Sequence, residues 1–125
     1  MIAFYRMRNE KNIFFVTYEE MKRDLKDVVR RLSRFLECND LSKSEMEKLL
    51  NHLSFKSMKE SHFGNHKHFI KSFRETSDNF EFLRRGIIGS YKDELSSENA
   101  EKINNKSRIF FEKYGIRESD IFGVV

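Results

Sequence analysis

Apolar residues recur at helical spacing in two segments of the first half of the chain. The segment DLKDVVRRLSRFLEC has apolar residues three or four positions apart at Leu25, Val28, Val29, Leu32, Phe35 and Leu36. Asp24 precedes them, where an N-cap residue is favoured. The segment SKSEMEKLLNHLS opens with Ser42 and Glu45 at the spacing of a capping box. Each segment therefore predicts an amphipathic helix with one buried face.

A third helical pattern lies near the C-terminal end of the sequence. It begins near Ser96 or Ser97 and stops at Gly115, a residue type that commonly ends helices. The residues that this pattern predicts to be buried are Ala100, Ile103, Phe110 and Tyr114. Residues 60–80 show no clear period, so we expect a loop there, and a loop of that length is usually functional or mobile.

One segment has the pattern of a strand. NIFFVTY, residues 12–18, is a continuous apolar run rich in β-branched and aromatic residues. Continuous apolarity predicts a buried strand that is covered on both faces, as in the parallel sheet of an α/β fold. Because a single strand cannot form a sheet for the helices to cover, we expect the other strands of the domain to lie outside these residues.

Composition bounds the class of protein. The length of 125 residues suits one domain, and 24 basic against 20 acidic residues is too even a balance to indicate nucleic acid as a partner. Cys38 is the single cysteine, which excludes an intramolecular disulfide and a thiolate metal cluster. There is no apolar run of about eighteen residues and no signal-peptide pattern, so we expect a cytoplasmic protein without a membrane segment.

The segment FLRRGIIGSYK, residues 82–92, carries the strongest chemical signal. Arg84 and Arg85 stand directly before Gly86. A guanidinium group binds phosphate with two parallel hydrogen bonds, and a glycine lets the backbone come close to a ligand. This combination indicates a site for an anion, and a phosphate group is the anion we expect. The alternative interpretation is a solvated charge pair at a turn.

Three segments in order, TYEEMKRD, HLSFKSMK and FLRRGIIGSYK, resemble the C-terminal third of the cytosolic sulfotransferase family. This family transfers a sulfuryl group from phosphoadenosine phosphosulfate (PAPS) to an alcohol, phenol or amine. The order and intervals of the segments agree from Asn12 to Tyr114. The resemblance implies an α/β fold, in which residues 1–125 are the C-terminal part of a single domain with a P-loop-like parallel sheet. That part would be mostly helical, with one buried strand at about 12–18.

The resemblance implies two groups of nucleotide-binding residues. Tyr18 would lie near the adenine, Ser54 and Phe55 would line the adenine pocket with Phe55 stacking on the base, and Met58 would pack beside it. In isolation, Phe55 and Met58 are better interpreted as core residues. The second group, Arg84, Arg85 and Gly86, matches the two cations and the backbone amide that hold the ribose phosphate in the family.

Several positions depart from the family pattern. Leu53 stands where the family has a threonine, and Ser90 and Tyr91 replace an aspartate and a tryptophan. The short dimerisation segment of the family falls on Lys92, Ser96, Ser97 and Glu101, and its apolar member is missing. The family-type homodimer contact is therefore doubtful for this chain.

No catalytic residue is assigned in this sequence. The phosphosulfate loop and the histidine base of the family lie in its N-terminal two thirds, and no segment here matches them. The resemblance therefore implies PAPS as co-substrate, no metal, and a fragment that is inactive alone. The family segment that corresponds to residues 60–80 folds over the acceptor. Here four phenylalanines suit an aromatic or hydrophobic small-molecule acceptor with a polar end, at Phe63, Phe69, Phe73 and Phe80.

Other interpretations remain open for the segment between residues 60 and 80. His62, His66 and His68 have a spacing that suggests a metal site, but Gly64 interrupts the helix that this spacing would need. The run HFGNHKHFIKSFR alternates aromatic and basic residues, which is compatible with a non-catalytic basic helical module that binds a protein or RNA. A third possibility is a degenerate sulfotransferase relative that binds nucleotide without turnover.

Overall fold

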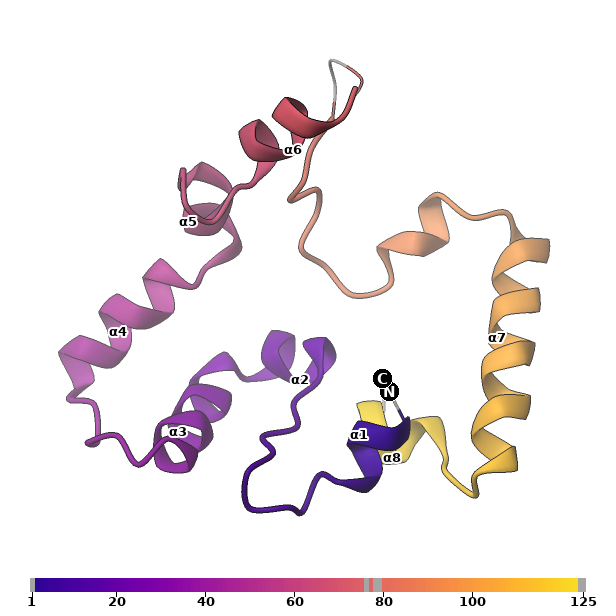
Figure 1. The fold of residues 1–125 in the computed structure, drawn as a ribbon, viewed down its shortest axis with the longest axis horizontal. Helices are drawn as coiled ribbons and strands as arrows, with labels where there is room; N and C mark the ends of the chain where they lie inside the picture. Colours follow the sequence, from indigo (N-terminus) through magenta and orange to yellow (C-terminus); the bar gives the residue numbers. More distant parts are fainter. Residues whose placement is uncertain (1, 76, 78–79, 124–125) are drawn as a thin grey trace. The chain divides into compact units, whose positions relative to one another are not determined.

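The computed structural model describes residues 2–75, 77 and 80–123. This part of the chain contains eight α-helices and one 3₁₀ helix (Figure 1). They are α1 (Ile2–Arg6), α2 (Tyr18–Arg23), α3 (Leu25–Phe35), α4 (Lys43–His52), α5 (Phe55–Glu60), α6 (Lys67–Phe73), η1 (Ser90–Asp93), α7 (Ser97–Lys113) and α8 (Glu118–Phe122). Within these described residues no helix is long and apolar enough to cross a membrane.

The chain divides into two compact units. The first unit combines the residues up to Asp40 with those from Ile88 onward, and the second comprises Leu41–Ile87. Helices α1, α2, α3, α7 and α8 and the 3₁₀ helix η1 belong to the first unit, whereas α4, α5 and α6 belong to the second. The first unit is therefore assembled from two segments that are distant in sequence.

Helices α2 and α3 pack against each other and share one capping residue. Asp24 ends α2 and begins α3, and its carboxylate accepts a hydrogen bond of 2.9 Å from the backbone N–H of Asp27. Arg31 on α3 forms an ion pair with Glu20 on α2. Val28 and Val29 are buried, which confirms the predicted helix and part of its predicted inner face, although Leu36 remains exposed.

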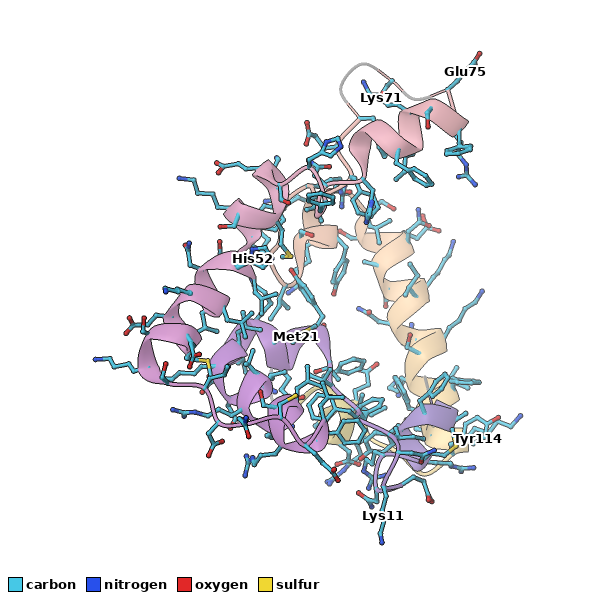
Figure 2. All side chains as sticks on the ribbon, turned by 60° about the vertical axis from the view of Figure 1, so that its left-hand side comes forward. Lys11, Met21, His52, Lys71, Glu75 and Tyr114 are labelled. Carbon is cyan, nitrogen blue, oxygen red and sulfur yellow. The ribbon has the colours of Figure 1, made fainter. Side chains whose placement is uncertain are left out.

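The core of the first unit joins α1, α7 and α8. Its buried members are Ile2, Phe111 and Ile121, and partly buried aromatic and aliphatic side chains surround them. The hydroxyl group of Tyr5 on α1 donates a hydrogen bond of 3.1 Å to the carbonyl oxygen of Asp120 on α8. Helices α1 and α8 lie side by side, close to Tyr114 at the end of α7 (Figures 1 and 2).

The predicted inner face of α7 was partly wrong. The structure buries Phe111, whereas Phe110 and Ile103 are 52% and 51% exposed. Both Phe110 and Phe111 fit a helical pattern of apolar residues. Ile2 and Ile121 contact the side of α7 that carries Phe111, and this tertiary contact decides which phenylalanine is buried.

The buried strand expected at residues 12–18 is not confirmed. Residues 13–17 have no regular secondary structure, Tyr18 begins α2, and no strand occurs among the described residues. Thr17 is extended and buried, and its hydroxyl oxygen accepts a hydrogen bond of 3.2 Å from the backbone N–H of Glu20 as the N-cap of α2. A strand needs a neighbouring strand to complete its backbone hydrogen bonds, and the described residues supply none.

The second unit consists of three helices. Ser42 begins α4 with the predicted capping box, in which Ser42 and Glu45 each accept a hydrogen bond from the backbone N–H of the other. Met46 is the buried residue of α4, and α4 packs against α5. The region 60–80, for which a loop was expected, contains the short helix α6; its seven residues are too few to show a clear period.

The buried position of Phe111 predicts a large effect of its truncation. We expect Phe111→Ala to lower the stability of the first unit by on the order of 3 kcal/mol, because it removes a buried ring and leaves a cavity. Ile109→Ala is the matched control on the same helix, since Ile109 is 62% exposed. Amide hydrogen exchange along α7 measures both variants. Equal effects of the two substitutions would contradict the assigned core.

The start of α8 predicts a dependence of stability on pH. The carboxylate of Asp120 accepts hydrogen bonds from the side chain of Arg117, 2.8 Å from Nη2, and from its backbone N–H at 3.0 Å. These bonds lower the pKa of Asp120 below its ordinary value of 3.8. Because the pKa of Asp120 is lowered in the folded state, its ionised carboxylate stabilises the fold at pH values above the ordinary pKa of 3.8. This contribution is lost as the pH falls through the lower pKa of the folded state.

We therefore expect the carboxyl carbon of Asp120 to titrate in an NMR experiment with a midpoint below 3.8. Arg117→Gln removes the guanidinium donors and should move the midpoint back toward that value. An unchanged midpoint in Arg117→Gln would show that the side chain of Arg117 does not hold this carboxylate.

Candidate functional site

The N-terminus of α5 carries three of the residues that sequence analysis assigned to the adenine pocket. Ser54 is the N-cap, and its hydroxyl oxygen accepts a hydrogen bond of 3.1 Å from the backbone N–H of Ser57. Because Ser54 is the cap, the first residue of α5 is Phe55. Leu53 and Ser54 connect it to His52, the last residue of α4 (Figure 2). Met58 lies three positions after Phe55, on the same side of α5.

Gly86 lies directly against the ring of Phe55. A Cβ atom added to Gly86 would lie 2.5 Å from Cγ and 2.6 Å from Cε2 of that ring, and closer still to Cδ2. Such distances leave no room for any side chain. Gly86 also has a φ of 65°, a conformation that residues with a side chain rarely adopt. The structure thus places in contact the two segments that were assigned to the adenine side and the ribose-phosphate side of one nucleotide site.

Arg84 and Arg85 stand on the same irregular stretch as Gly86. Residues 84–87 form no helix or strand, and both arginine side chains are exposed. Each arginine takes part in an interaction in the structure, so neither is without a partner. An exposed guanidinium next to a glycine with positive φ can supply paired donors to a phosphate group.

A cavity of about 490 Å³ opens beside Phe55. Its lining residues are Phe55, Lys56, Lys59, Glu60, Asn65 and Glu81. The ammonium group of Lys59 lies 3.6 Å from the carboxylate of Glu81, and the side-chain amide of Asn65 donates a hydrogen bond of 2.8 Å to the carbonyl oxygen of Lys59. The volume is that of a small-molecule pocket, and its wall combines an aromatic ring with two ammonium and two carboxylate groups.

Sequence analysis did not single out the polar residues of this cavity. Lys56 and Lys59 follow Phe55 on the six-residue helix α5. Their one signal in the sequence is the presence of two lysines in the segment that carries the proposed stacking residue. Asn65 has no such signal, because only the turn after α5 brings it back to the cavity.

Tyr18 belongs to the first unit. It is the first residue of α2, follows the capping residue Thr17, and is 44% exposed. The other six assigned residues all belong to the second unit, namely Ser54, Phe55, Met58, Arg84, Arg85 and Gly86. Within that unit the structure places Gly86 against Phe55, with the arginine pair directly before it in the chain.

The histidines between residues 60 and 70 do not share one helix. His62 lies in the turn after α5, and His66 is the N-cap residue of α6. The His66 ring packs edge-on against Phe82, with 5.4 Å between ring centroids. The described side chains contain no group of three residues that could hold a metal ion, and the side chain of His68 lies outside them.

Comparisons with known proteins agree on one family. The family model described as the sulfotransferase domain matches residues 2–115. The luciferin sulfotransferase of Photinus pyralis is 35% identical over 101 residues, which are 78% of this chain and 27% of that protein. The amine sulfotransferase of Oryctolagus cuniculus is 32% identical over 112 residues, which are 89% of this chain and 36% of that protein. The chain thus spans about a third of the length of these relatives.

Solved structures show the same fold. A mouse sulfotransferase complexed with PAP matches 97% of this chain and 41% of its own, with a TM-score of 0.67 and 27% identity. A retinol dehydratase in complex with androsterone and PAP matches 94% of this chain with a TM-score of 0.76, although the identity is only 23%. Because a family model covers most of the sequence and relatives above 30% identity cover most of it as well, the chain belongs to the sulfotransferase family.

Proposed function

We propose that this chain is the C-terminal part of a sulfotransferase domain that transfers a sulfuryl group from PAPS to a hydroxyl or amine group of a small acceptor. In this proposal Ser54, Phe55 and Met58 form the adenine side of the nucleotide site. Arg84, Arg85 and Gly86 form its ribose-phosphate side, and the assignment of Tyr18 to the adenine stays a prediction from the resemblance. The contact between Gly86 and the ring of Phe55 is the observation that carries the proposal.

That contact supports the proposal because it joins two kinds of chemistry in one place. An aromatic ring can accept a purine by stacking, and two guanidinium groups can bind a phosphate on the sugar of the same nucleotide. The cavity beside Phe55 gives a ligand space next to the ring, and its two lysines are balanced by Glu60 and Glu81, so the anion-binding part of the proposal rests on Arg84 and Arg85. Two solved relatives of this fold are described in complexes with PAP, which fits a nucleotide of this class.

The exposed apolar surface supports the placement of this chain within a larger domain. Many large apolar side chains stay exposed, among them Phe4, Ile103, Ile109 and Phe110. Exposed apolar surface of this extent usually marks an interaction site. The remainder of the domain, which we expect to provide the phosphosulfate loop and the histidine base, would cover it.

The bound co-substrate would supply the sulfuryl group, and the residues of this chain would bind and orient it. Charged donors that are fixed before the reaction stabilise negative charge without reorganising, and orientation of the donor favours in-line displacement. The sequence assigns no general base to this chain, so we propose that it is inactive alone. The activity that we propose for the complete domain needs no metal. As for other cytosolic sulfotransferases, we propose a cytoplasmic location.

We expect Arg84→Ala or Arg85→Ala to weaken binding of PAP, taken as phosphoadenosine phosphate, by about 2 kcal/mol, or roughly 30-fold. Binding of adenosine 5'-monophosphate, which lacks the ribose phosphate, should change little. Arg108→Ala on α7 is the control, because Arg108 is an exposed arginine of the first unit. NMR titration of the 125-residue chain measures all affinities. If the unchanged chain binds both nucleotides equally, the assignment of the arginine pair is wrong.

The acceptor is proposed to contact the region around α6. The rings of Phe69 and Phe73 lie 4.8 Å apart and are 64% and 73% exposed, and Phe63 of the preceding turn is also exposed. Lys71 lies on the same helix and Glu75 just beyond it (Figure 2). Exposed aromatic rings beside polar groups suit an apolar acceptor with a polar end.

A chimera tests both the activity and this acceptor assignment. The chain replaces the matched 112 residues of the Oryctolagus cuniculus amine sulfotransferase. We expect PAPS-dependent sulfation by the chimera, and we expect Phe69→Ala to change the relative kcat/KM of phenols, aliphatic alcohols and amines several-fold, because only acceptor contacts are removed. The KM for PAPS should stay the same.

Arg108→Ala, at an exposed position of α7 outside the proposed acceptor region, is the control for a surface substitution in the chimera. Equal losses for every acceptor, or a parallel loss of PAPS binding, would show that Phe69 has a structural role. A chimera that folds but does not transfer sulfate with any acceptor would contradict the proposed activity itself.

A further inference from the structure

The contact of Gly86 with Phe55 is made with the face of the ring. The position of a Cβ atom at Gly86 is nearest to Cδ2 and almost equally distant from the two flanking carbons, at 2.5 Å from Cγ and 2.6 Å from Cε2. A point in the ring plane beyond Cδ2 would be much farther from both flanking carbons than from Cδ2. A hydrogen atom of Gly86 therefore points at one face of the Phe55 ring.

Two independent features require a glycine at position 86. The first is its φ of 65°, and the second is the absence of space for a side chain above the Phe55 ring. Gly115 allows the effect of φ to be distinguished from the effect of the missing space. It has the same φ of 65° as Gly86, but nothing lies within 4 Å of the position of a Cβ atom there. An alanine at either position must adopt the same unfavourable φ, and only at residue 86 does it also collide with an aromatic ring.

The backbone of α5 under this ring is held from two further sides. The cap by Ser54 fixes the first turn of the helix. Gly64 lies against the backbone of Met58, where a Cβ atom would be 2.9 Å from the carbonyl oxygen and 3.3 Å from Cα. The helix backbone is thus fixed at both Ser54 and Met58, and the remaining freedom of Phe55 is the rotation of its side chain. Gly86 limits that rotation.

We propose that Gly86 is a positioning residue for the ring of Phe55. It covers one face of the ring and leaves only the opposite face for a purine, so that the base is held in one orientation relative to Arg84 and Arg85. The stacking of the base and the binding of the phosphate are then linked through one rigid contact. This inference rests on the proposed nucleotide site, and it adds a role for Gly86 that differs from donation of its backbone N–H to phosphate.

The contact itself can be tested without any nucleotide. Protons above an aromatic face resonate far upfield, so one Hα of Gly86 should be shifted upfield in the NMR spectrum of the unchanged chain. In Phe55→Leu this shift should disappear, while the spectrum of Gly115 should stay the same. An ordinary chemical shift for both Hα protons of Gly86 in the unchanged chain would overturn the proposal.

The functional role is tested with adenosine 5'-monophosphate, which offers the base but not the ribose phosphate. We expect Gly86→Ala to weaken its binding about tenfold, because the displaced ring no longer stacks well on the base. Gly115→Ala should change the affinity less than twofold. In the Phe55→Leu background the further change Gly86→Ala should also have less than a twofold effect, because no ring remains to be displaced.

The outcomes separate this inference from the proposed function. If Gly86→Ala weakens only PAP and not adenosine 5'-monophosphate, Gly86 acts as a phosphate ligand and the positioning role is wrong. If Gly86→Ala does not fold, the double variant with Phe55→Leu decides: recovery of folding supports the contact, and failure to recover overturns it. If the unchanged chain shows the upfield proton but binds neither nucleotide, the proposed site fails, and with it the role of the contact in binding.

Discussion

Five of the described helices, α2, α3, α4, α5 and α7, depend on side-chain oxygens that accept hydrogen bonds at their N-termini. Thr17, Asp24, Ser42, Ser54 and Ser96 each accept a bond from the backbone N–H three residues later. Short helices are marginal in water, and the chain buries few side chains that could compensate. A cap satisfies an otherwise unpaired N–H and is worth about 1 kcal/mol. Capping therefore determines where each of these helices begins, and the cap at Ser54 fixes the position of Phe55.

Local signals were sufficient for the helices that have such caps. The predictions of α3 from Asp24 and of α4 from Ser42 and Glu45 were confirmed, and α7 begins and ends where the sequence indicates. These signals act within a few residues and need no knowledge of the rest of the molecule. The segment 12–18 differs, because an apolar run fits a strand only when another strand lies beside it, and the described residues contain none.

The resemblance predicted both sets of residues as two sides of one nucleotide site, but the contact between the two sets was not predictable. The motif around Phe55 and the motif around Arg84 are recognisable in the sequence. Their contact through Gly86 is tertiary, and no spacing along the chain encodes it. The same limit applies to Phe111, which periodicity alone could not distinguish from Phe110, and to Asn65, which a turn brings back to the cavity beside Phe55.

The division of the chain has a consequence for folding during synthesis. The second unit is continuous in sequence, so all of its residues are synthesised before the segment from Ile88 onward. The core of the first unit needs Ile2 together with Phe111 and Ile121, and it cannot close until the last of these has been translated. Helix α1 is therefore without its core partners on α7 and α8 while the middle of the chain is being made. During that interval the side chain of Ile2 stays exposed, and exposed apolar surface on an unfinished chain favours aggregation.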